Sequence, residues 1–244
     1  MKIFDTILNT KQDVLIALKE LNQPSFQRIV SNIKAGSFKR DPDNNDYQDR
    51  LVYTRVFRKF AYNPAILNEV FSCPELKESF FRTFGYKGDL EFTIYPNCWL
   101  RDLPMLDIGS QTYLADGILL GTNQVSTDQK VLKVGTIKIG ERCVFDQDCK
   151  VGYNSIIGDD CIIGIQTSIG LKCKMGSNVK IGEATTIRHG VTIGNDVIIG
   201  GETQIGNFCI IEDGVVIEEF STIPTFSLVT KEGVFNRKAL RKTA

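Results

Sequence analysis

The sequence predicts a mainly β fold, a parallel β-helix preceded by a small α-helical domain, and two observations predict it. From Ile139 to Thr222 the chain divides without a slip into fourteen hexapeptides. Their first residue is always apolar and in eleven cases Ile. Residues 1–90 instead carry apolar residues at helical spacing. A fixed hexapeptide period is typical of β-helices, in which three short strands form one triangular coil of about 18 residues.

Composition excludes several classes of protein. Apolar residues make up 42% of the 244 residues, enough for a sizeable core, and 29 basic residues balance 29 acidic ones. A nucleic-acid binder usually carries a basic excess, so no nucleic acid is expected as a partner. No apolar stretch is long enough to span a membrane, and the charged N-terminus, MKIFDTILNTKQD, is unlike a secretion signal. We therefore expect a cytoplasmic protein without a membrane span.

Residues 1–90 are predicted to form the small helical domain. Thr10 and Asp13 have the spacing of a capping box at the start of a helix. A later helix carries an apolar stripe at Val52, Tyr53, Val56, Phe57 and Phe60. Its cationic residues form either a phosphate-binding patch or an ordinary solvated face: Arg50, Arg55, Arg58 and Lys59. The domain is expected to cover the open edge of the first coil.

The other boundaries follow from where the hexapeptide register begins and ends. Residues 91–107 are expected to link the helices to the β-helix, with Trp99 at the junction. The β-helix is expected over 108–230, with a polar loop inserted at 126–138 where the register is interrupted. A basic tail, 231–244, is expected to follow.

Two further hexad positions support the β-helix. The second residue is Gly in ten of the fourteen hexads, which we interpret as allowing the backbone to turn the corner. The fifth residue is always small and is expected to pack inside the prism. Five of the seven cysteines occupy this position and are interpreted as small core residues: Cys143, Cys149, Cys161, Cys173 and Cys209. With one histidine and no CxxC pair, no metal site is expected.

The pattern aliphatic-Gly-x-x-small-x over 139–222 resembles the bacterial transferase hexapeptide family. The resemblance implies a left-handed parallel β-helix, a handedness opposite to the general preference of parallel strands. It also implies a homotrimer in which the outer wall of one subunit forms a cleft with its neighbour. In that cleft an acyl-CoA such as acetyl-CoA, or an acyl-carrier protein, would donate its acyl group.

His189, in the stretch IRHGVTIG, is the only histidine of the chain. As the third residue of its hexad, it should face outward from the prism. The stretch is similar in residue and phase to the catalytic histidine of left-handed β-helix acyltransferases of the lipid A and sugar-nucleotide types. The resemblance implies that the neutral imidazole is a general base for an acceptor that attacks an acyl thioester. From spacing alone, an ordinary surface histidine is an equal interpretation.

The neighbours of His189 depart from that pattern. Gly190 follows where those enzymes often have Asp or Asn. Asn207, one coil later, stands where they frequently have a Gly whose backbone N–H polarises the thioester carbonyl, so Asn207 is expected to offer its N–H to an oxyanion. Three basic residues are either contacts for the phosphates of CoA or part of a solvated tail: Lys231, Arg237 and Lys238.

A second resemblance lies in GTNQVSTDQKVLKVGTIKIG, residues 121–140. It is similar to a loop of sugar O-acetyltransferases of the same superfamily, where the loop supplies the catalytic histidine. That histidine is absent here, and Asn123 or Val125 stands nearest its place. Asn123 and Asp128 are expected to contact an acceptor, with an ordinary loop turn as the equal alternative.

The leading hypothesis is an acyltransferase that moves an acetyl or other acyl group to a small-molecule acceptor, a sugar hydroxyl or amine, with no tightly bound cofactor. The alternative is a non-catalytic trimeric scaffold or an inactive paralogue, which predicts no CoA binding and no effect of replacing His189. A carbonic anhydrase on this fold would need three zinc-binding histidines and is excluded.

Overall fold

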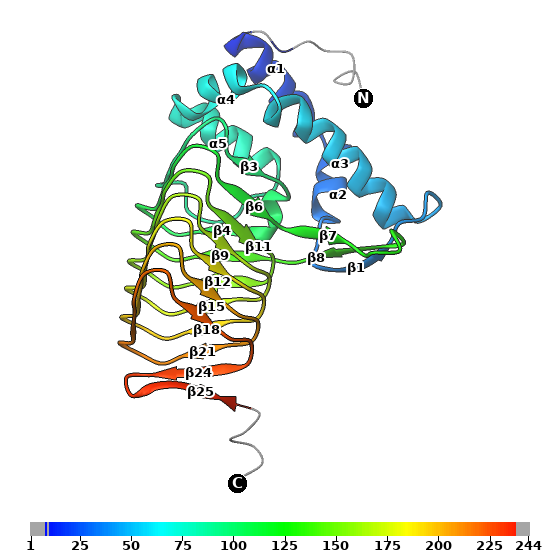
Figure 1. The fold of residues 1–244 in the computed structure, drawn as a ribbon. Helices are drawn as coiled ribbons and strands as arrows, with labels where there is room; N and C mark the ends of the chain where they lie inside the picture. The colour runs from blue at the N-terminus through cyan, green and yellow to red at the C-terminus, as the bar shows by residue number, and fades with distance from the viewer. Residues whose placement is uncertain (1–7, 9, 238–244) are drawn as a thin grey trace.

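The computed structural model describes residue 8 and residues 10–237. A group of helices lies over one end of a long three-walled prism, whose coils continue to residue 230 (Figure 1). The predicted mainly β class, a parallel β-helix with N-terminal helices, is confirmed. No helix among the described residues is long and apolar enough to cross a membrane.

The described N-terminal part contains the helices α1 (Lys11–Leu21), α2 (Pro24–Ser31), α3 (Asn45–Ala61), α4 (Pro64–Phe71) and α5 (Pro74–Thr83). The predicted capping box is confirmed, because Thr10 Oγ1 accepts from the Asp13 N–H and the Asp13 carboxylate accepts from the Thr10 N–H. Helices α2, α4 and α5 begin with proline, whose missing N–H has no intrahelical partner in the first turn anyway. Buried aromatic rings pack the helices together: Phe26, Tyr53, Phe57, Phe60, Phe80 and Phe84.

Two buried tyrosines join the helices to the first coil. Tyr53 Oη donates to the Phe84 carbonyl at 3.1 Å and accepts from the Leu103 N–H at 3.2 Å. Tyr86 Oη donates to the Ile108 carbonyl and accepts from the Ile108 N–H. Burial raises the pKa of Tyr86 to about 12, so its hydroxyl stays protonated as a donor. The hydrophobic core is continuous from helices to prism, and the helices cover the first coil.

Three parallel sheets form the walls of the prism. Wall 1 contains β2 (Thr93–Ile94), β5 (Tyr113–Leu114), β10 (Val144–Phe145), β13 (Ile162–Ile163), β16 (Lys180–Ile181), β19 (Ile198–Ile199) and β22 (Val216–Ile217). Wall 2 contains β3 (Trp99–Leu100), β6 (Leu119–Gly121), β11 (Lys150–Gly152), β14 (Ser168–Ile169), β17 (Thr186–Ile187), β20 (Gln204–Ile205) and β23 (Thr222–Ile223).

Wall 3 contains β4 (Leu106–Ile108), β9 (Ile137–Ile139), β12 (Ser155–Ile157), β15 (Lys174–Met175), β18 (Thr192–Ile193), β21 (Ile210–Ile211) and β24 (Ser227–Thr230). The strand β25 (Gly233–Asn236) pairs antiparallel with β24, so the expected tail supplies a strand where it is described. Along the regular repeat each residue pairs with the residue 18 positions later, as Val144 does with Ile162. The chain therefore visits walls 1, 2 and 3 in turn in every coil.

The β-helix begins earlier than expected. Strands β2 and β3 lie within 91–107, the segment expected to be a linker, and pair with β5 and β6. Their sequence, EFTIYPNCWL, lacks the second-position glycine, and these strands pair at a separation of 20 residues, as Ile94 does with Leu114, so the hexapeptide register did not reveal them. The excursion expected at 126–138 belongs to an antiparallel hairpin of β7 (Asn123–Val125) and β8 (Val131–Val134). Strand β8 also pairs with β1 (Gly36–Lys39), which ties the hairpin to the N-terminal part.

The chain turns each corner at the fourth residue of a hexad and not at the second. The prediction that the second-position glycines allow the backbone to turn the corner is therefore wrong. Fourth residues adopt the left-handed backbone conformation, as at Ala184 (φ 50°) and Glu202 (φ 52°). The second-position glycine is needed because stacked coils approach closely. A Cβ on Gly182 would lie 2.4 Å from the backbone nitrogen of Gly201 in the next coil.

The five cysteines at the fifth hexad position are buried, and all seven described cysteines are free thiols. Burial raises the pKa of Cys149 to about 11, so this thiol stays protonated near neutral pH. Their interpretation as small core residues is confirmed.

Candidate functional site

His189 lies in the turn from β17 to β18, at the corner between walls 2 and 3, and its side chain is exposed as its hexad position predicts. Its Nδ1 accepts a hydrogen bond from the backbone N–H of Leu171, one coil earlier, at 3.0 Å. A ring nitrogen that accepts a hydrogen bond carries no proton, so the neutral imidazole held in this way has its proton on Nε2. Nε2 makes no hydrogen bond within the described part of the chain.

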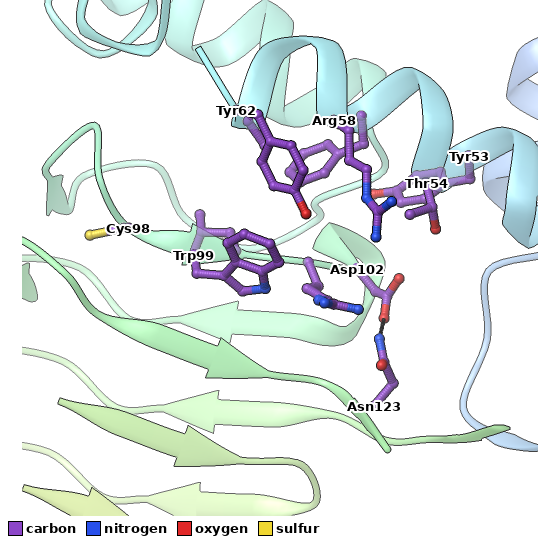
Figure 2. A pocket seen from close by; sticks show the side chains of 12 residues that line it. Tyr53, Thr54, Arg58, Tyr62, Cys98, Trp99, Asp102 and Asn123 are labelled. Carbon is purple, nitrogen blue, oxygen red and sulfur yellow. Dashed lines mark hydrogen bonds between the residues drawn. The ribbon is translucent and has the colours of Figure 1, made fainter. Parts of the chain in front are cut away.

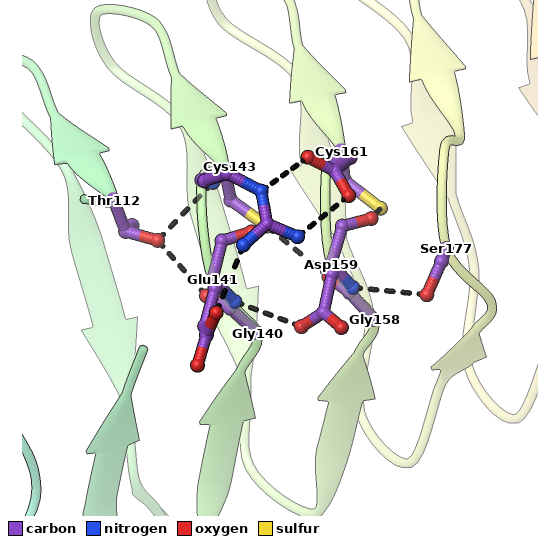
Figure 3. Close-up of polar contacts among 10 residues, drawn as sticks. Thr112, Gly140, Glu141, Cys143, Gly158, Asp159, Cys161 and Ser177 are labelled. Carbon is purple, nitrogen blue, oxygen red and sulfur yellow. Dashed lines mark hydrogen bonds and ion pairs between the residues drawn. The ribbon is translucent and has the colours of Figure 1, made fainter. Parts of the chain in front are cut away.

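The hydrogen bond to Nδ1 is one rung of a repeated ladder. At the corner between walls 3 and 1, Asp159 Oδ1 accepts from the Glu141 N–H at 2.9 Å, and Ser177 Oγ accepts from the Asp159 N–H at 3.1 Å (Figure 3). The same bond is repeated further down this corner by Asn195 and Asp213. Third-position side chains thus satisfy backbone N–H groups of the preceding coil, and His189 is one of them.

This geometry differs from the expected general base. A base needs an unprotonated nitrogen aimed at the acceptor, whereas the lone pair of His189 is occupied by the Leu171 N–H. The Asn207 side chain is also engaged, because its Oδ1 accepts from the His189 N–H at 3.1 Å. Because third-position N–H groups in this ladder donate to the coil that follows, we expect the N–H of Asn207 to face the coil of Thr225. The role of Asn207 as an oxyanion donor stays a prediction.

Gly190 shapes an apolar surface next to His189. It has a positive φ of 68°, and a Cβ there would lie 2.6 Å from the ring of Phe208. Phe208 is 48% exposed and stacks on Phe226 with ring centroids 5.2 Å apart. Gly190, which stands where the similar enzymes often have Asp or Asn, thus leaves room for the ring of Phe208.

Of the basic residues expected to contact CoA, the structure brings Arg237 to the His189 corner, where its Nη1 donates to the Phe208 carbonyl at 2.7 Å. Lys231 lies instead at the corner between walls 3 and 1, where a Cβ on Gly214 would be 3.0 Å from Nζ. Lys238 lies outside the described residues.

The two residues expected to contact an acceptor lie at different places on the hairpin. Asn123 begins β7, and its Nδ2 donates to Asp102 Oδ2 at 3.0 Å (Figure 2). Asp128 lies at the exposed tip, where it accepts from Ser126 Oγ and the Lys130 N–H. The hydrogen bond from Ser126, followed by that from Lys130, lowers the pKa of Asp128. Asp128 thus stabilises the turn and does not face the same surface as Asn123.

Asn123 lines a pocket whose residues come from several distant segments, and the sequence did not predict that they meet. This junction pocket, of about 630 Å³, opens between α3, the hairpin and the segment after β3. No Asp or Glu is among its described lining residues, and six cationic side chains are: Arg40, Arg50, Arg55, Arg58, Lys59 and Arg101. Four of them were recognised on one helix, but Arg40 and Arg101 come from distant segments that no motif connects.

A second pocket shares Arg58, Arg101 and Asn123 with the junction pocket, and in it the rings of Tyr62 and Trp99 lie 5.0 Å apart and join α3 to the first coil (Figure 2). Below them, Arg50 and Asp102 form a buried ion pair with side chains 8% and 3% exposed. Asp102 Oδ2 also accepts from Thr122 Oγ1 at 2.6 Å. This network fixes the floor of the pocket.

Within the described residues, no group of three or more His, Cys, Asp or Glu side chains is arranged to hold a metal ion.

Comparison with known proteins agrees with the repeat and the fold. Residues 172–207 match the family model of the bacterial transferase hexapeptide (six repeats). The chain therefore carries the repeat of this family, and the resemblance found in the hexads is confirmed. The matched segment contains His189, Gly190 and Asn207. No curated protein matches the sequence.

Among solved structures, the chain is similar to a UDP-N-acetylglucosamine acyltransferase, with 21% identity and a TM-score of 0.50. The match covers 65% of this chain and 66% of that one, just under two thirds of its length. It is also similar to the UDP-N-acetylglucosamine O-acyltransferase of Moraxella catarrhalis (17% identity, 66% of this chain and 74% of that one, TM-score 0.48). A third similar structure is a hexapeptide-repeat acetyltransferase of Vibrio cholerae complexed with acetyl coenzyme A (14% identity, 80% and 89%, TM-score 0.34). The first likeness shows the fold, a left-handed parallel β-helix.

Proposed function

We propose that this protein is an acyltransferase of the hexapeptide-repeat type, which moves an acetyl or other acyl group from acyl-CoA or acyl-carrier protein to a sugar amine or hydroxyl. The observation that carries the proposal is the exposed imidazole of His189, held at Nδ1 by the Leu171 N–H so that Nε2 is available to a substrate. The family repeat and the fold shared with a UDP-N-acetylglucosamine acyltransferase support it.

In this geometry His189 acts as a hydrogen-bond donor. Nε2–H donates to the thioester carbonyl oxygen, which gains negative charge when the acceptor attacks. A neutral amine attacks the carbonyl carbon, the C–N bond forms and the C–S bond breaks. The proton of the attacking nitrogen goes to the departing thiolate, which leaves an amide and a free thiol. A hydroxyl acceptor would need a base, and His189 would first have to release the Leu171 N–H, so an amine is the better acceptor.

The acyl donor has a cationic contact at the same corner. The guanidinium of Arg237 donates to the carbonyl of Phe208, which leaves its positive charge without a carboxylate partner within the described residues. We assign to Arg237 the contact with a phosphate of the acyl donor, which Lys231 cannot share because it lies at another corner.

We also propose a homotrimer, because the outside of wall 1 is largely apolar. Lys180 of β16 is a charged exception, and four outward side chains of this wall are apolar and 39–60% exposed: Val144, Ile162, Ile198 and Val216. The matching positions of wall 2 are polar: Lys150, Ser168, Thr186, Gln204 and Thr222. A cyclic trimer brings two different surfaces of each subunit together. If wall 1 packs on wall 3 of the next subunit, where Ile156 is 46% exposed, the His189 corner at the edge of wall 3 lies in the cleft between them.

Ile198→Asp should dissociate the trimer, because it places a charge in an apolar interface. The matched control is Gln204→Asp, which occupies the same hexad position on wall 2 and should leave the assembly intact. Sedimentation velocity measures both masses. Equal masses for the two variants and the unaltered protein would contradict an interface on wall 1.

His189→Asn should abolish acyl transfer without unfolding the corner. Asn at this position can keep the ladder bond to the Leu171 N–H, as Asn195 and Asn207 do in their own coils, but it has no Nε2. Calorimetric titration with acetyl-CoA first establishes the donor, and an amino-sugar screen then supplies the acceptor. We expect a rate loss of roughly 100-fold or more for His189→Asn. His189→Ala should lose the same activity and, in addition, about 1 kcal/mol of stability from the unmade hydrogen bond.

A second candidate function is a non-catalytic trimeric scaffold, and the ladder itself favours it, because His189 makes the same bond as Asn195. The scaffold predicts that neither acetyl-CoA nor CoA binds and that His189→Asn behaves like the unaltered protein. If neither acetyl-CoA nor CoA gives a heat of binding in the calorimetric titration, the result would contradict CoA as the carrier of the donated acyl group. Binding of acetyl-CoA with unchanged turnover in His189→Asn would contradict the role of Nε2.

A further inference from the structure

We propose that the junction pocket binds a small molecule that carries a diphosphate group. The pocket lies between α3, the hairpin and the first coil. Its cationic side chains come from α3, from the segment before α3 and from the segment after β3. The proposal does not depend on acyl transfer at His189.

The pocket holds positive charge that the protein does not neutralise. Arg50 is balanced by Asp102, whereas the guanidinium of Arg40 donates to a neutral group, the Gln129 carbonyl, at 2.8 Å. Arg58 lies over the ring of Tyr62 and Arg101 over that of Trp99, with guanidinium carbons 5.5 and 5.0 Å from the ring centroids. Within the described residues, no carboxylate comes within 4.0 Å of the cationic groups of these three arginines.

Like charges that face one cavity repel one another unless an anion lies between them. The chain as a whole is neutral, with 29 basic and 29 acidic residues, so this local excess is not a by-product of composition. Three arginines without a carboxylate match the two to three negative charges of a diphosphate better than the charge of one phosphate monoester. The planar guanidinium also suits phosphate oxygens, because it can donate two parallel hydrogen bonds.

The shape of the site favours a small ligand over an acidic protein surface. Its volume of about 630 Å³ lies within the usual range of small-molecule pockets, roughly 300–1,000 Å³. The side chains of Tyr47 and Thr54 line it and add neutral hydroxyl donors. The ion pair of Arg50 and Asp102 keeps its floor rigid before any ligand arrives.

The position of the pocket leaves two sources of the diphosphate. The hairpin leaves the prism at the corner between walls 2 and 3, and Tyr153 Oη contacts Gln124 of the hairpin at 3.4 Å. Gly135, at the base of the hairpin, lies three coils before His189 along this corner, a distance of about 14 Å at the strand spacing. A nucleoside diphosphate would remain within the pocket. Coenzyme A bound with its diphosphate in the same place would extend its arm along the corner, and its phosphates would then lie here and not at Arg237.

Calorimetric titration of the whole chain with inorganic pyrophosphate tests the proposal. Trp99, the only tryptophan, lies against Arg101 and provides a second signal through its fluorescence. We expect saturable binding that weakens roughly tenfold in Arg58→Gln and again in Arg101→Gln. Neither arginine has a carboxylate partner within the described residues, so neither substitution leaves a buried carboxylate without its cation. Arg82→Gln is the matched control, because Arg82 belongs to the same helical part but donates to the Tyr86 and Gly88 carbonyls outside the pocket.

Titrations with ADP and with CoA then distinguish the two sources. Equal affinities for ADP and CoA would support a nucleoside diphosphate site, and tighter binding of CoA would support a diphosphate site that continues along the corner. The proposal is overturned if pyrophosphate gives no saturable signal beyond sodium chloride of equal ionic strength, even if an acidic protein binds. It is also overturned if Arg58→Gln and Arg101→Gln bind pyrophosphate like Arg82→Gln. Pyrophosphate has no acyl group, so these results are separate from any failure of acyl transfer.

Discussion

Arg50→Met is expected to lower the free energy of unfolding by about 3–5 kcal/mol, because it leaves the carboxylate of Asp102 buried without its cation. Both side chains are almost inaccessible, at 8% and 3% exposure. The remaining partners of Asp102, Thr122 and Asn123, are neutral donors and do not balance its charge. Urea denaturation followed by circular dichroism measures the loss.

Two variants show whether the buried charge is the cause. Lys34→Met removes a lysine from a pair with Asp46 at 3.5 Å, but these side chains are 58% and 41% exposed, so the loss should stay below about 1 kcal/mol. Arg50→Met combined with Asp102→Asn should recover most of the stability, since Asn keeps an oxygen that accepts from Thr122. Equal losses at Arg50 and Lys34, or a double variant as unstable as Arg50→Met, would refute the explanation.

Gly182→Ala is expected to destabilise the β-helix by roughly 2–3 kcal/mol. The added Cβ would lie 2.4 Å from the backbone nitrogen and 2.7 Å from the Cα of Gly201. These are backbone atoms of the next coil, held by wall hydrogen bonds on both sides, so they cannot move aside as a flexible side chain would. The midpoint of urea unfolding, followed by circular dichroism at a strand wavelength, measures the effect.

The control lies two residues further along the same coil. Ala184 has a φ of 50°, a conformation unfavourable for any residue with a Cβ. Ala184→Gly relieves this strain but makes the unfolded chain more flexible, so we expect a net gain of about 0.5 kcal/mol. Opposite effects of the two changes would show that the second position is constrained by stacking and the fourth by backbone conformation. Tolerance of Gly182→Ala together with damage from Ala184→Gly would reverse this assignment.

The regular part of the fold follows from the amino-acid sequence because every coil repeats the same contacts. With pairing fixed at 18 residues, a single hexad position decides whether a side chain such as Ile187 or Cys173 lies inside the prism. The same register predicted that the side chain of His189 faces outward, although it did not place the residue at a corner. Local hydrogen bonding likewise explains why the capping box at Thr10 was predictable, since both partners lie within one turn.

Features that depend on contacts between distant segments were not predictable. The first coil, at Thr93–Ile94 and Trp99–Leu100, lacks the second-position glycine and lies outside the 18-residue register, and its place is set by the pairing of its strands with the coil that follows. The tautomer of His189 depends on the N–H of Leu171 in the preceding coil, and the pattern of apolar first and small fifth residues gives no sign of this third-position hydrogen bond. Arg40, Arg58 and Arg101 meet in one pocket only because β1 pairs with the hairpin and α3 packs on the first coil. A periodic sequence specifies contacts that recur at a constant separation, whereas such single contacts between remote segments arise when the chain packs in three dimensions.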